Sequence, residues 1–366
     1  MCRIAEAKPA DARLLVDRTL DDAVRRRASD VHLEPTGDGL EVRLRIDGLL
    51  ETVETVDAAV GRSMVTRLMV MAHLLTYRLD VPQEGRATIV VSAASHPLDL
   101  RLSIMPTTHG LRAAVRMPGE LLQVHSLSEL RLPESVIAGL ERFAGADAGM
   151  LLLTGPAGSG KTTTIYALLQ HIADKSPGLS IVALEDPVER DLPGVTQIEV
   201  APFGELTYER TLRSMLRQDP QVLMLGEIRD AATATLAIQA ALSGHRLVST
   251  LHAGTPAGAI ARLIEMEIEP YQITSALFGV VAQRLVRKTG NNGRYEGRIP
   301  IAEFVAMDAR LRSAILRRDD AATLTKIYAG QSSFRPMRES AGDLIRAGLT
   351  DDAEVDRVLG SLPGSG

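Results

Sequence analysis

The most distinctive chemical segment of the chain is a glycine-rich stretch that ends in a lysine and two threonines. It follows a short apolar run, Met150–Thr154, and precedes a segment with helical spacing. This is the phosphate-binding loop pattern in the strand–loop–helix setting that the pattern requires. The glycines let backbone N–H groups converge on a polyphosphate, Lys161 reaches the β- and γ-phosphates, and the Thr162 hydroxyl binds Mg²⁺. The residues assigned to this site are Gly155, Pro156, Ala157, Gly158, Ser159, Gly160, Lys161, Thr162 and Thr163.

Three further polar residues follow apolar runs in the next hundred residues. Glu227 comes just after Val222–Leu225, and a carboxylate there is expected to orient Mg²⁺ or its water. Glu185 follows another apolar run and precedes an Asp-Pro pair, so it either polarises the attacking water or is a turn acid before proline. His252 ends the segment Leu247–His252, and we interpret it as a γ-phosphate sensor rather than a structural histidine.

The elements that must hold these residues alternate between short apolar runs and helices from about residue 149 onward. Apolar strands separated by helices predict a mainly parallel sheet covered on both faces, with the site at the carboxyl ends of the strands. Residues 1–118 mix helical spacing with period-2 alternation, as in Leu40–Ile46, and predict an α+β domain. The predicted organisation is an N-terminal domain over 1–118 and an α/β domain with the phosphate-binding loop over 119–366, mostly helical from about 257.

Composition excludes several other classes of protein. With 45% hydrophobic and 24% charged residues and a net charge of −5, the chain is neither disordered nor a membrane bundle. Cys2 is the only cysteine, so no internal disulfide is possible. Basic and acidic side chains balance over residues 1–118, and the chain has five Phe and no Trp, so no nucleic-acid partner is expected. The absence of a secretory signal predicts a cytoplasmic protein.

Taken together, these segments resemble the ATPases of type II secretion and type IV pilus assembly. The order of the family's motifs is reproduced by a Walker A loop at 155–162, an aspartate box at 185–189, a Walker B segment at 222–227 and a histidine box ending at His252. The likeness extends over most of the chain, through Ser29–Pro35, Val42–Gly48, Pro82–Arg86, Asp99–Ser103, Thr211–Pro220, Gly226–Asp230, Ala240–His245 and Ala282–Arg287.

The resemblance implies a fold and a mechanism. An N-terminal PAS-like domain would pack beside a RecA-like ATPase domain, six chains would form a homo-hexamer, and ATP with Mg²⁺ would bind between the two domains. It implies that Glu185 is the catalytic glutamate and Glu227 the acid associated with Mg²⁺. Arginines of the N-terminal domain, of the same or an adjacent chain, would reach the triphosphate; by motif position the candidates are Arg43, Arg45, Arg86 and Arg101.

Two departures from the family pattern modify these expectations. Many members carry a four-cysteine zinc module after the Ala282–Arg287 motif, whereas Thr289–Arg298 holds no cysteine, so no zinc is expected. The early start of the PAS-like motifs also implies that the family's extra N-terminal domain is missing. The expected role is to drive secretion or pilus-like assembly on an inner-membrane platform protein, with membrane association only through partners. A retraction motor and a nucleotide-responsive structural or regulatory ring subunit with little turnover remain as alternatives.

Overall fold

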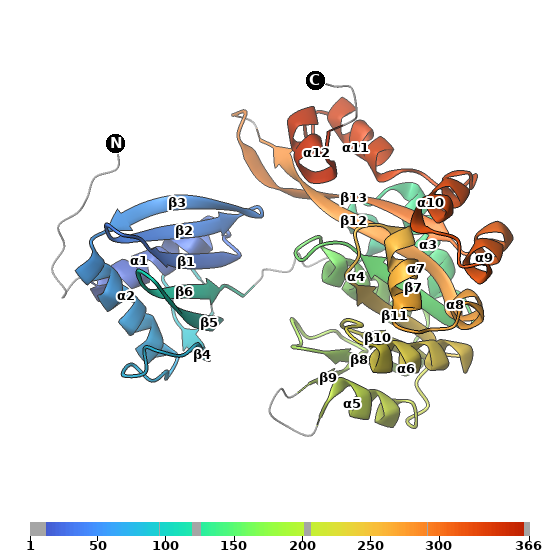
Figure 1. Cartoon of the computed structure of the whole chain (residues 1–366), viewed down its shortest axis with the longest axis horizontal. Coiled ribbons are helices and arrows are strands. Elements are labelled where there is room, and N and C mark those ends of the chain that lie inside the picture. Colours follow the sequence, from blue (N-terminus) through green and yellow to red (C-terminus); the bar gives the residue numbers. More distant parts are fainter. Residues whose placement is uncertain (1–11, 95, 119–125, 201–205, 291, 362–366) are drawn as a thin grey trace. The chain divides into compact units, whose positions relative to one another are not determined.

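The computed structural model describes residues 12–94, 96–118, 126–200, 206–290 and 292–361. The chain divides into two compact units, Met1–Glu120 and Leu121–Gly366. Cys2 and the residues immediately after the predicted boundary at 118 lie outside the described residues. Each unit has its own sheet (Figure 1). The buried hydrophobic side chains of the two units form separate clusters.

The first unit is a six-stranded antiparallel sheet in the order β3-β2-β1-β6-β5-β4, with two helices on one face. Its elements are α1 (Ala12–Arg25), β1 (Asp30–Pro35), β2 (Leu40–Ile46), β3 (Leu49–Val56), α2 (Ala58–Met71), β4 (Gln83–Ile89), β5 (Leu98–Thr107) and β6 (Gly110–Arg116). Side chains alternate across each strand, so Val42 and Leu44 enter the core while Arg43 and Arg45 lie on the opposite face. Helix α2 begins where the Asp57 carboxylate accepts two backbone N–H groups, each at 2.9 Å.

The second unit is a seven-stranded sheet in the order β13-β12-β7-β11-β10-β8-β9, parallel except for the β12–β13 pair. Its strands are β7 (Gly149–Thr154), β8 (Ile181–Glu185), β9 (Thr196–Glu199), β10 (Val222–Leu225), β11 (Arg246–Leu251), β12 (Leu277–Thr289) and β13 (Tyr295–Ala306). Its α-helices are α3 (Glu134–Ala144), α4 (Lys161–Lys175), α5 (Tyr208–Met215), α6 (Ala231–Leu242), α7 (Pro256–Glu265), α8 (Pro270–Ala276), α9 (Ala309–Leu316), α10 (Ala321–Ala329), α11 (Met337–Arg346) and α12 (Asp352–Leu359), and a 3₁₀ helix spans Leu127–Leu130.

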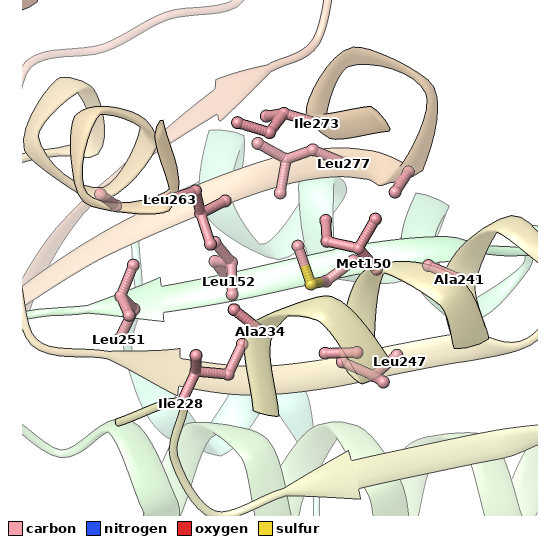
Figure 2. Close-up of a cluster of buried hydrophobic side chains, with 14 of the residues drawn as sticks. Met150, Leu152, Ile228, Ala234, Ala241, Leu247, Leu251, Leu263, Ile273 and Leu277 are labelled. Atoms are coloured by element: carbon pink, nitrogen blue, oxygen red, sulfur yellow. The ribbon is translucent and has the colours of Figure 1, made fainter. Parts of the chain in front are cut away.

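Both faces of this sheet are buried, which explains why its strands are apolar throughout. On β7, Met150 and Leu152 enter one core, which is completed by α5 to α10, while Leu151 and Leu153 enter a second core with α3 and α4. Figure 2 shows the first of these cores, where Met150 and Leu152 contact a layer that includes Leu247 of the neighbouring strand. The sequence of a parallel strand that is buried on both faces is therefore a continuous run of apolar residues.

The prediction of an α/β fold, with an α+β first domain before a parallel-sheet domain, is confirmed. The expectation of a mostly helical region from about residue 257 is wrong over residues 277–306, which form the long antiparallel strands β12 and β13. Most of β12 is buried on both faces, so its sequence lacks the alternation that identifies a strand and resembles a buried helix. Helices do form most of residues 309–359.

Candidate nucleotide-binding site

The glycine-rich loop joins β7 to α4, and its backbone requires glycine at three positions. Gly155, Gly158 and Gly160 have φ values of +148°, +73° and +86°, which residues with a Cβ adopt only with strain. Helix α4 begins at Lys161, and no described side chain caps its first turn. The first N–H groups of α4 are therefore available to an anion, as in other phosphate-binding loops.

Lys161 is 8% exposed, and its ammonium lies over the loop. Its Nζ donates to the carbonyl oxygens of Gly155 at 2.8 Å and Pro156 at 2.9 Å. Burial lowers the pKa of Lys161, and the neighbouring Arg284 guanidinium lowers it further. A buried cation near a second cation is electrostatically unfavourable, and a bound polyphosphate would relieve that cost.

Glu227 is surrounded by charged groups at the ends of β10 and β11. One carboxylate oxygen accepts from Arg229, and the other lies 3.0 Å from His252 Nε2. Arg229 also lies 3.5 Å from the Asp186 carboxylate, so it connects the segment after β10 with the segment after β8. His252, assigned from sequence to the same site, is thus in direct contact with the Walker B acid.

Glu185 ends β8 and is only 2% exposed. Tyr166 Oη donates to Glu185 Oε2, and Gln197 Nε2 donates to Glu185 Oε1 at 2.9 Å. Burial raises the pKa of Glu185, and the two hydrogen bonds oppose that rise. A carboxylate with a raised pKa is a stronger base than an exposed one, which suits a group that takes a proton from water.

The structure brings the sequence-predicted groups of this unit to one edge of the sheet. β7, β11, β10 and β8 are consecutive parallel neighbours, so the loop, His252, Glu227 and Glu185 all lie at the carboxyl ends of adjacent strands or just after them. Glu227 is close enough to raise the pKa of Lys161 by its charge. Open parallel sheets bind ligands at this edge.

The donors near the loop suit Mg²⁺ held mainly by a nucleotide. Thr162 is half-buried in the first turn of α4, and Glu227 supplies carboxylate oxygens. Within the described residues no three His, Cys, Asp or Glu side chains gather into a metal-binding group. Mg²⁺ bound with phosphates needs only one or two protein oxygens besides water, so these residues fit the ion.

The candidate arginines of the first unit share the sheet face that the helices leave uncovered. Strand register places Arg86 opposite Arg101, and Arg101 opposite Arg116, on three adjacent strands. The same row continues through Asp30 to Arg45, whose Nε lies 3.3 Å from the Asp30 carboxylate. Sequence reasoning missed Arg116, and strand register is the information that identifies it.

Arg43 lies in the next row of the same face. It stands two residues before Arg45 on β2 and opposite His32 of β1. The four predicted arginines therefore share one sheet face. Like charges directly opposite one another on a sheet are destabilising, so the row Arg86–Arg101–Arg116 is suited to an anionic partner.

Sequence reasoning also missed the side chains that hold the site residues. Tyr166 and Gln197 hold Glu185, Arg229 holds Glu227, and Gln283 contacts the glycine-rich loop. All except Tyr166 and Gln197 lie in segments that carry the family resemblance, but no pattern indicated a contact for any of the four. Tyr166 lies in an otherwise apolar stretch of α4, which was the available signal for a buried polar contact.

A glycine-rich phosphate loop at the carboxyl edge of this parallel sheet defines a P-loop protein with a RecA-like fold. The chain belongs to the type II/IV secretion system protein family, whose sequence model matches residues 6–357. No helix in the described parts of the chain is long and apolar enough to cross a bilayer.

Similar proteins include ATPases of secretion and pilus systems. The chain is 37% identical over 363 residues to the type II secretion system protein HxcR of Pseudomonas aeruginosa, covering 94% of this chain and 76% of that protein. It is 35% identical to the type II secretion system ATPase E of Vibrio cholerae, covering 94% and 74%. It is 33% identical to the type IV pilus assembly ATPase PilB of Thermus thermophilus, covering 96% of this chain and 43% of that protein.

Solved structures share the fold at lower identity. The pilus retraction motor PilT with bound ADP has a TM-score of 0.65 and 23% identity, covering 95% of this chain and 97% of that one. The ATPase DotB of Yersinia pseudotuberculosis has a TM-score of 0.72 and 18% identity, covering 97% and 95%.

Proposed function

We propose that this chain is an Mg²⁺-dependent ATPase that drives a type II secretion or type IV pilus-like machine as a homo-hexamer. The observation that carries the proposal is the convergence of the loop lysine, two acids and a histidine at one sheet edge. The family supports ATP as the substrate, because relatives over nearly the whole chain are named as secretion or pilus ATPases. The working location is the cytoplasmic face of the inner membrane, through a platform protein partner.

In this proposal each residue of the second unit has a separate task. The loop backbone and Lys161 bind the β- and γ-phosphates, and Glu185 takes a proton from the attacking water. His252 contacts both Glu227 and the γ-phosphate. Its contact with Glu227, the Walker B acid, therefore depends on whether the γ-phosphate is present. Mg²⁺, held by Thr162 and Glu227, would supply charge neutralisation at the phosphate oxygens when bound.

The arginines of the first unit supply the remaining positive charge. A guanidinium placed on the triphosphate stabilises the charge that develops in the transition state. Arg86 and Arg101 share a row with Arg116, while Arg43 and Arg45 lie further along the same face. We propose that this face meets the nucleotide of the same or an adjacent chain.

Steady-state phosphate release by the purified protein tests the proposal. Lys161→Ala should abolish hydrolysis, because it removes the cation that holds the phosphates, while Lys175→Ala at the exposed end of the same helix should not. Glu185→Gln should bind ATP but not turn it over, and Glu227→Gln should lose Mg²⁺-dependent activity. Normal turnover by Glu185→Gln together with ATP binding but no turnover by Glu227→Gln would move the role of base to Glu227.

A ring subunit with little turnover is the second candidate, and one observation favours it. Both oxygens of Glu185 and both of Glu227 are engaged by protein groups, so an attacking water would have to share an oxygen with one of these groups or displace it. Measurable phosphate release by the wild-type hexamer, lost in Lys161→Ala, would exclude this alternative. Tight ATP binding without release would establish it.

A further inference from the structure

Gln283 of β12 contacts the glycine-rich loop although it lies more than a hundred residues away in sequence. It is 2% exposed, and both ends of its amide are bonded. Nε2 donates to the carbonyl oxygen of Ser159 at 2.9 Å, and Oε1 accepts from the Thr164 hydroxyl at 2.9 Å. One side chain therefore joins the loop to the first turn of the helix that follows it.

The loop also fits closely against this residue. A Cβ on Gly155 would lie 2.4 Å from the Gln283 carbonyl oxygen, and a Cβ on Gly160 would lie 2.7 Å from Gln283 Nε2. Gly158, in contrast, has nothing within 4 Å of its Cβ position. Gly155 is thus required by contact with the Gln283 backbone as well as by its own backbone angle, and a Cβ on Gly160 would displace the Gln283 amide from its bonded position.

The contact with Ser159 fixes the direction of a neighbouring amide. In a planar trans peptide the C=O of one residue and the N–H of the next point in opposite directions. Because Gln283 holds the Ser159 carbonyl, the N–H of Gly160 is directed to the other side of the loop. That N–H is one of the donors that a phosphate-binding loop presents to its ligand.

Strand pairing determines the position of this contact. β12 pairs in parallel with β7, and Ala282 lies opposite Thr154, the last residue before the loop. The next residue along β12 is Gln283, so its backbone lies beside Gly155 and its side chain reaches Ser159. The loop is supported by a neighbouring strand of the sheet as well as by its own sequence.

We propose that Gln283 is a positioning residue that holds the phosphate-binding loop in its nucleotide-binding shape. This inference rests on the proposed function, since it concerns how the same loop binds ATP and ADP. Gln283→Leu keeps the side-chain size and removes both hydrogen bonds. We expect it to weaken ATP and ADP binding about equally, by about tenfold, because a misdirected Gly160 N–H would cost the bound phosphate about one hydrogen bond.

The test is equilibrium titration with a fluorescent ADP analogue, competition with ATP, and steady-state kinetics. The KM for ATP should rise more than kcat falls, since a misplaced loop weakens binding before it affects the water-activating groups. Gln331→Leu is the matched control, because Gln331 also bonds a backbone carbonyl of the second unit, that of Ala306. It should leave nucleotide binding unchanged.

Variants at the other partner keep the test decisive if Gln283→Leu does not fold. Thr164→Val should weaken binding by removing the hydroxyl that holds Gln283, and Thr164→Ser should restore it. Equal nucleotide affinities for wild type and a folded Gln283→Leu, or for Thr164→Val and Thr164→Ser, would overturn the inference. Failure of the wild-type protein itself to bind ATP would instead overturn the proposed function, and with it this inference.

Discussion

Substituting Tyr166 by Phe tests whether the buried hydrogen bond between Tyr166 and Glu185 sets the pKa of Glu185, the proposed catalytic base. The change removes one hydroxyl and preserves the ring, including its contact with the Arg190 guanidinium at 5.6 Å. Of the two described side chains that donate to Glu185, Gln197 then remains. Because Glu185 is 2% exposed, water cannot readily replace the lost donor.

The size of the effect follows from that burial. A hydrogen bond to a charged group contributes about 1.5–3 kcal/mol, so Tyr166→Phe should lower the free energy of unfolding by about 2 kcal/mol near pH 7. For a unit of this size, Tm should fall by about 4–8 °C. The lost bond favours the ionised carboxylate, so its removal should raise the pKa of Glu185 beyond the rise that burial already causes.

The assay is kcat for ATP hydrolysis as a function of pH, together with thermal denaturation. Glu185 acts as a base only when ionised, so the acid limb of the kcat profile should move to higher pH in Tyr166→Phe. The loss of stability should be largest at pH values above the folded pKa of Glu185 and should shrink below it, where the carboxyl is protonated. Tyr328→Phe, which removes a hydroxyl bonded to Thr325, is the control. A kcat profile superimposable on that of wild type would refute the reasoning.

Three further predictions concern other parts of the chain. Gly160→Ala should weaken ADP binding by more than tenfold, since its Cβ would lie 2.7 Å from the Gln283 side-chain nitrogen. Gly158→Ala meets no such contact and should lower the free energy of unfolding by only about 1–2 kcal/mol, through backbone strain. Titration of both variants with ADP separates the two effects. Arg287→Met should lower the free energy of unfolding by about 1.5–3 kcal/mol at pH 7, because it removes one charged partner of the buried Glu354 carboxylate, which keeps the Arg357 guanidinium. The pKa of Glu354 is lowered from 4.5 to about 2, so this loss of stability should be complete above pH 4.5 and fade toward pH 2 in denaturant titrations. A loss of stability independent of pH would contradict the ion pair as its cause. Arg101→Leu should stabilise the first unit by up to about 1 kcal/mol by relieving like-charge contacts, yet should reduce ATP hydrolysis; unchanged hydrolysis would remove this row from the site.

The local chemistry of the site could be predicted from sequence, because a phosphate-binding loop is specified by consecutive residues. Lys161 and its glycines lie within one strand–loop–helix segment, and the strands before Glu185 and Glu227 are short apolar runs bounded by turns. Parallel pairing then brings their carboxyl ends together without further information.

The supporting contacts could not be predicted, because they depend on strand pairing. Gln283 reaches Ser159 and Thr164 across 124 and 119 residues. The sequence of β12 itself predicts a helix, since a strand buried on both faces lacks alternation. The arginine row likewise depends on the register of three strands, which no periodicity within one strand reveals.

Strand β12 has a practical consequence for experiments with shortened proteins. Four residues after Gln283, on the same strand, Arg287 is held by the Glu354 carboxylate of α12 at 2.7 Å. Removing the last two helices would strip Arg287 of that partner and expose the apolar side chains of β12 that these helices cover, such as Val286. Loss of ATP hydrolysis in such a truncated protein would therefore be explained by disruption of β12 beside the phosphate-binding loop. It would not be evidence that the deleted helices have a catalytic role.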